Sequence, residues 1–64
     1  MEYTNSQIRE AIEEHIHSER DRQILMRRLI DGITFERLAE EFDMSPRQIK
    51  TIVYKGEKIL FSRM

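Results

Sequence analysis

Apolar residues recur along this 64-residue chain at the spacing of helices and never gather in a long run. The longest apolar runs, such as 24–26 and 59–61, span only three residues. Only two glycines and one proline interrupt the pattern, and the spacing follows the period of a helix instead of the alternation of a strand. The sequence therefore predicts an all-α fold.

The absence of cysteine limits how so short a chain can be held together. Neither a disulfide nor a thiolate zinc site is available, so the 39% of residues that are hydrophobic must stabilise the fold by packing. A chain of this size buries only about 60% of the surface that its unfolded form exposes. We therefore expect one domain, residues 1–64, of modest stability. No apolar run approaches the ~20 residues of a membrane span, and nothing resembles a signal peptide, so we expect a cytoplasmic protein.

Four helices fit the pattern, and the first half of the chain accounts for two of them. We expect the first over residues 5–17, because Thr4 and Gln7 form a capping box at its start. We expect the second over residues 19–30, with Ser18 as its N-cap. The residues that these two helices should turn inward are Ile8, Ala11, Ile12, Ile16, Ile24, Leu25, Leu29 and Ile30.

The second half of the chain should form two further helices, over residues 35–42 and 46–60. Thr34 is placed to cap the first of them. Ser45 is placed to cap the second, with Pro46 at its first position, where the missing N–H costs nothing. The residues that should face inward are Leu38, Ala39, Phe42, Ile49, Ile52, Val53, Gly56 and Leu60.

This second pair of helices, over residues 34–60, has the pattern of a helix-turn-helix. Ala39 is placed where the two helices would cross, and a larger side chain there would push them apart. Asp43 occupies the turn, where glycine is usual, and aspartate tolerates the left-handed conformation better than most residues. The second helix of such a motif enters the major groove of DNA. A purely structural helical bundle would show much of the same spacing, so the pattern alone leaves both interpretations open.

Charge divides the chain into an acidic and a basic part, although its net charge is only −1. Residues 1–43 carry six basic and eleven acidic groups, whereas residues 44–64 carry five basic groups and the single acid Glu57. A one-sided basic helix is the electrostatic footprint of a phosphate binder. Lysines on a solvated helix face would give the same count.

Several short segments of this sequence occur together, in this order, in one protein family. They are residues 18–22, 24–25 with Arg28, 31–36, 38–42, 43–45 and 49–52. Over residues 8–60, without a gap, the sequence resembles region 4 of the sigma-70 family of bacterial RNA polymerase sigma factors. The resemblance implies a four-helix module that reads promoter DNA through its last helix and touches the flap of the polymerase β subunit. LuxR-type regulators share much of this pattern.

The resemblance also implies which residues contact DNA. Those expected to face the bases are Arg47, Gln48, Lys50 and Thr51. Those expected near phosphates are Arg28, Thr34, Lys55 and Lys58. The chemistry fits, because arginine or lysine can donate to guanine, glutamine can pair with adenine, and lysine neutralises phosphate.

Each assignment has a simpler alternative. Gln48 lies three residues after Ser45 and can complete a capping box, and Thr34 is also needed as a cap. Thr51 and the two lysines assigned to phosphates can be ordinary solvated residues. Pro46 departs from the arginine-rich start of this helix in primary sigma factors, so the base preference of the family does not carry over.

The expected partners are double-stranded DNA and a second protein. A single module of this kind buries only ~600–1,000 Å² of protein surface on DNA. Useful affinity therefore calls for a homodimer, or for tethering to RNA polymerase or another DNA-bound protein. The main alternative function is a protein-interaction module that contacts polymerase, a sigma partner or an anti-sigma protein through the acidic first helix.

An enzyme is the least expected class. His15 and His17 lie two residues apart, so on a helix they point to different faces and cannot hold a metal together as an i, i+4 pair does. Each serine or threonine at a helix start already has a capping role. We expect neither a metal nor another cofactor.

Overall fold

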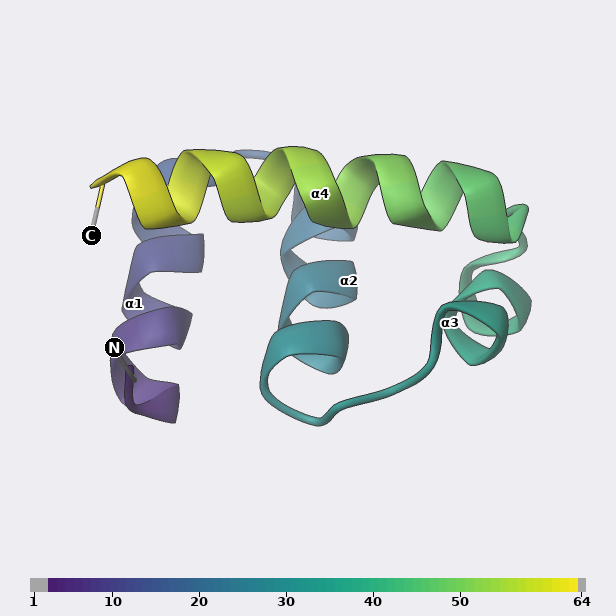
Figure 1. The fold of residues 1–64 in the computed structure, drawn as a ribbon, viewed down its shortest axis with the longest axis horizontal. Coiled ribbons are helices and arrows are strands. Elements are labelled where there is room, and N and C mark those ends of the chain that lie inside the picture. Colours follow the sequence, from purple (N-terminus) through teal and green to yellow (C-terminus); the bar gives the residue numbers. More distant parts are fainter. Residues whose placement is uncertain (1–2, 64) are drawn as a thin grey trace.

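The computed structural model describes residues 3–63, and these residues form four helices and no strand. The helices are α1 (Asn5–His15), α2 (Glu19–Leu29), α3 (Phe35–Phe42) and α4 (Pro46–Arg63). The prediction of an all-α fold with four helices is confirmed. In Figure 1, α4 runs along one edge of the molecule, and α1, α2 and α3 all lie on the same side of it. None of the described helices has the length and apolar character needed to cross a bilayer.

Each of the first three helices begins at the cap that the sequence supplies. Thr4 Oγ1 accepts a hydrogen bond from the Gln7 amide at 3.2 Å, and Gln7 Oε1 accepts one from the Thr4 amide at 2.9 Å. Ser18 and Thr34 cap α2 and α3, each accepting from the backbone amide three residues further on. These bonds satisfy amides that the first turn of a helix leaves without a partner.

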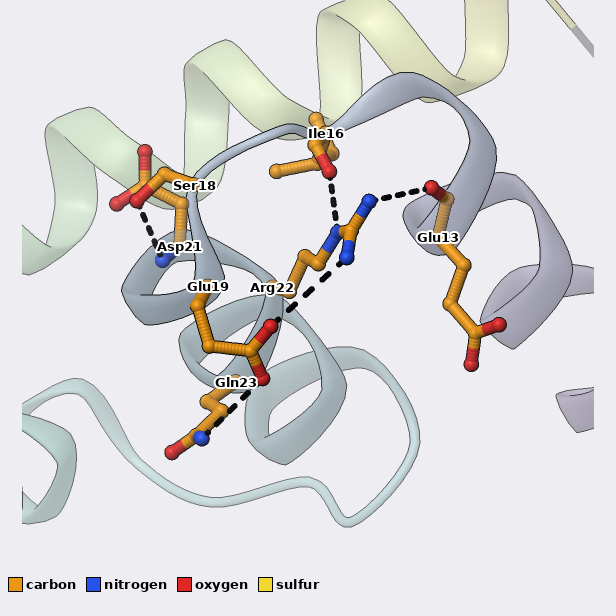
Figure 2. Close-up of polar contacts among 7 residues, drawn as sticks. All are labelled: Glu13, Ile16, Ser18, Glu19, Asp21, Arg22 and Gln23. Atoms are coloured by element: carbon orange, nitrogen blue, oxygen red, sulfur yellow. Dashed lines mark hydrogen bonds and ion pairs between the residues drawn. The ribbon is translucent and has the colours of Figure 1, made fainter.

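The end of α1 differs from the predicted one. The pattern predicts a helix that reaches residue 17, but α1 ends at His15, and Ile16 is extended with φ −106° and ψ 119°. The extended Ile16 keeps its side chain in the core, where it is 7% exposed. In Figure 2, the Arg22 guanidinium donates to the carbonyl oxygens of Glu13 and Ile16. It thereby satisfies carbonyl groups that the helix end leaves free.

Two other helix ends also differ from the predicted ones. α2 ends at Leu29, one residue early, and Gly32 turns the chain beyond it at φ 70°. α4 continues to Arg63 instead of ending at residue 60. Phe61 in this extra turn stacks on Tyr3 with ring centroids 5.7 Å apart, and this contact ties the end of α4 to the start of α1.

The core consists of two clusters of buried apolar side chains, each with members from α2 and α4. The cluster at the α1 end contains Ala11, Ile12, Ile16, Leu25 and Leu60. The cluster at the α3 end contains Ile24, Leu38, Ala39, Ile49 and Val53. Ile30, which the pattern places inward, belongs to neither cluster because it follows the last residue of α2, whereas Met26 packs on the first cluster.

Two backbone positions determine how closely the helices approach. Asp43 ends α3 in the expected left-handed conformation, with φ 54° and ψ 49°, and leads into the three-residue turn before α4. Gly56 of α4 lies against the buried Leu25 of α2, so that a Cβ at Gly56 would come 2.6 Å from Leu25 Cδ1. Gly56 therefore permits close packing of α4 on α2.

Candidate nucleic-acid interface

One face of α4 packs on the core and the opposite face is open. The buried residues are Ile49, Val53, Gly56 and Leu60, at intervals of three or four. The exposed residues on the opposite side, which we call the outer row, are Arg47, Thr51, Tyr54 and Lys58. All four side chains are exposed, which agrees with the position of the other three helices on one side of α4 in Figure 1.

The open face of α4 is basic, and its cations form no ion pair with the described carboxylates. The helix carries five basic groups and one acid, Glu57, which is half-buried on its flank. Within residues 3–63, every ion pair joins side chains of residues 14–41, and none includes a cation of α4. Cations that lack a nearby carboxylate keep their positive potential available to an anionic ligand.

Arg47 shares a surface hollow with a cation of another helix that the sequence analysis did not identify. A shallow hollow between the starts of α2 and α4 is lined by Arg20, Met44, Arg47, Gln48, Thr51 and Ile52. The Arg20 side chain is 57% exposed, and its guanidinium bonds Asp21 Oδ1 at 3.2 Å. Arg20 falls within the segments that carry the sigma resemblance, but only the folded chain places it in the same hollow as Arg47.

Gln48 acts as part of the α4 cap. Its Oε1 accepts a hydrogen bond from the Ser45 amide at 3.0 Å, and Ser45 Oγ accepts one from the Gln48 amide at 3.1 Å. Bidentate pairing of glutamine with adenine uses both the oxygen and the nitrogen of the side-chain amide. The capping bond occupies that oxygen, so the structure favours the simpler of the two alternatives for Gln48.

Lys50 projects from the flank of α4 toward an aromatic ring that it shares with Arg28. Arg28 Cζ lies 4.3 Å and Lys50 Nζ 5.7 Å from the centroid of the Phe35 ring. Arg28 Nη1 also donates to the Ile33 carbonyl oxygen at 3.0 Å. We call Arg28, Phe35 and Lys50 the Phe35 cluster. It groups Lys50, predicted to contact bases, with Arg28, predicted to lie near phosphate.

Thr34 precedes the Phe35 cluster at the start of α3. Its Oγ1 accepts a hydrogen bond from the Arg37 amide at 3.2 Å, so its hydroxyl serves as the cap. The amides of the first turn of a helix point outward and suit a phosphate oxygen. The position of Thr34 therefore agrees with a phosphate contact made by the main-chain amides at the start of α3 and not by the Thr34 hydroxyl.

Lys55 and Lys58 do not lie together. Lys58 belongs to the outer row, whereas Lys55 lines a second hollow between α4 and the connection from α1 to α2. His15 and His17 line the same hollow, and only His15 belongs to α1. Among residues 3–63, no three side chains of metal-ligating type are grouped as a metal site would require.

The predicted site residues thus fall into three groups around α4. The outer row holds Arg47, Thr51 and Lys58, and one flank holds Lys50 with Arg28 and Thr34. Lys55 lies on the other flank, where Gln48 caps the start of α4. Comparison with known proteins gives no match, because no family model matches the sequence and no curated protein or solved structure matches it significantly. The relation to sigma region 4 accordingly stays a prediction.

Proposed function

We propose that this chain binds double-stranded DNA, with the first turns of α4 in the major groove. The observation that carries the proposal is the charge of α4. Its open face presents Arg47 and Lys58 in one row, with Lys50 and Lys55 on the flanks, and none of these cations is paired with a carboxylate among the described residues. A surface of this kind attracts the phosphate backbone.

The connection of α3 to α4 supports the same proposal. A three-residue turn separates the two helices, and Ala39 of α3 is buried in the same cluster as Ile49 of α4. In a helix-turn-helix, residues near the start of the second helix contact base edges. Arg47 and Thr51 occupy that part of α4, and arginine can donate to guanine O6 and N7.

Cations on both flanks of α4 suit the two backbones that border the groove. The Phe35 cluster supplies Arg28 and Lys50 on one flank, and Arg20 and Lys55 lie on the other. A major groove about 12 Å wide admits one helix between its two phosphate backbones. We infer that these four cations contact phosphates, and that Arg47 is the strongest candidate for a base contact.

The resemblance to sigma region 4 supports a role in transcription. Because one small module binds DNA weakly, a second contact is part of the proposal: RNA polymerase, another DNA-bound protein or a second copy of the chain would supply it.

Fluorescence anisotropy with a labelled duplex of mixed sequence tests DNA binding. With four phosphate contacts, the affinity should fall roughly 10²-fold between 50 and 200 mM salt. Lys50→Ala should weaken binding and reduce the salt slope by about one. Arg9→Ala removes the same charge from the exposed surface of α1 and should bind like the wild type. No anisotropy change at low salt would overturn the proposal and favour a protein-interaction module.

A further inference from the structure

Tyr54 is the most exposed of the large apolar side chains that the structure describes on α4. It is 58% exposed, against 41% for Phe61 and 36% for Ile59. Phe61 stacks face to face on Tyr3, whereas Tyr54 meets Phe35 edge-on, at 6.0 Å between centroids and 72° between planes. Leaving an aromatic ring in water is unfavourable, and tyrosine is enriched where one part of its ring packs and its hydroxyl meets a polar partner.

The surroundings of Tyr54 point to an anionic partner. Lys50 lies four residues before Tyr54 and Lys58 four residues after it, each one helical turn away, and the single carboxylate at such a spacing, Glu57, is half-buried. The edge contact with Phe35 holds the ring next to the cluster that also contains Arg28. The Tyr54 ring thus lies between Lys50 and Lys58 along α4 and against the Phe35 ring, which Arg28 also contacts.

The position of Tyr54 along α4 favours phosphate over a base edge. Residues at the start of a recognition helix contact base edges. Tyr54 comes one turn after Lys50 and Thr51, where a straight helix leaves the groove and approaches the backbone. Tyrosine is among the side chains that donate to phosphate oxygens in complexes with DNA.

We propose that Tyr54 is a DNA-contact residue whose hydroxyl donates a hydrogen bond to a phosphate oxygen, on the strand that the Phe35 cluster approaches. This inference rests on the proposed function, since it requires a duplex on the open face of α4. It adds a neutral donor to a surface whose other predicted phosphate contacts are mostly cations.

Tyr54→Phe tests the proposal, because it removes the hydroxyl and keeps the ring that meets Phe35. The dissociation constant for the mixed-sequence duplex should rise about 5- to 10-fold, while the melting temperature stays unchanged. Tyr3→Phe is the matched control: it removes the same atom from a residue that precedes α1 and stacks on Phe61, and its affinity should equal that of the wild type.

Duplexes carrying one neutral methylphosphonate at successive positions identify the atom that is contacted. At the phosphate bonded by Tyr54, the methylphosphonate should weaken the wild type more than it weakens Tyr54→Phe. Additive effects at every position, or wild-type affinity for Tyr54→Phe, would overturn the role of Tyr54 and leave DNA binding intact. A wild type that binds no duplex at low salt would overturn both proposals.

Discussion

Arg27 of α2 and Glu41 of α3 form an ion pair with two hydrogen bonds, 3.1 Å from Nε to Oε1 and 2.6 Å from Nη2 to Oε2. The hydrogen bond from Arg27, followed by the attraction of its charge, lowers the pKa of Glu41 below its ordinary value. The same bond raises the pKa of Arg27, and Asp31 adds to that shift. The pair joins α3 to α2 on the surface of the molecule.

Glu41→Gln should make stability less dependent on pH. A carboxyl group whose folded pKa is below its unfolded pKa stabilises the fold above the unfolded pKa, and this stabilisation is lost as the pH falls through the folded value. Thermal melts should therefore show a lower melting temperature for Glu41→Gln near pH 7, and a smaller deficit near pH 3. Glu40→Gln changes the neighbouring exposed carboxylate and is the control. Equal deficits at both pH values would contradict this account.

Gly56→Ala should destabilise the fold although alanine favours helices. The new methyl group would lie 2.6 Å from Leu25 Cδ1 and 2.7 Å from Leu25 Cδ2, and Leu25 is fully buried. Overpacking typically costs about 1–3 kcal/mol, which should exceed the gain in helix propensity of ~1 kcal/mol. Chemical denaturation measures the difference. Leu25→Ala should lower the free energy of unfolding by less in the Gly56→Ala background than in the wild type. Strictly additive losses would count against the contact between residue 56 and Leu25.

Arg22→Ala should loosen the end of α1. It removes hydrogen bonds from a charged group to two carbonyl oxygens, and we expect a loss of roughly 1–3 kcal/mol in the free energy of unfolding. Amide exchange should quicken near Ile16 before it does so in α4. Arg9→Ala, at an exposed position of α1, should leave both measurements unchanged. If Arg22→Ala unfolds like the wild type, water satisfies the two carbonyl groups equally well.

Gln48 variants should separate capping from base contact. Gln48→Ala should lower the free energy of unfolding by on the order of 0.5 kcal/mol and weaken DNA binding less than Arg47→Ala does. Gln48→Glu retains a capping box and should keep the stability, while its negative charge weakens binding to DNA. A loss of affinity in Gln48→Ala as large as in Arg47→Ala would assign Gln48 to base contact.

Features that depend on residues near in sequence could be predicted. The capping boxes at Thr4 and Ser45 each need a partner only three residues away, and the left-handed Asp43 follows from the tolerance of one residue type. The apolar period likewise placed Ile49 and Val53 in the core, because both repeat on one face of a single helix.

Features that depend on the angles between helices could not be predicted. Arg22 bonds carbonyl groups six and nine residues away, so the sequence gives no local sign that α1 stops at His15. The same limit applies to the site. Phe35 collects Arg28 and Lys50 from two other helices, and this placement depends on how α3 and α4 cross.

The position of α4 across both core clusters has a thermodynamic consequence. Leu60 at one end and Ile49 at the other belong to different clusters, so neither half of the core can form without this helix. Packing of its inner face and ligand binding at its outer face are therefore linked through one folding equilibrium. A duplex bound to the outer row should raise the melting temperature of the whole chain by mass action, in proportion to the logarithm of its concentration once that exceeds the dissociation constant.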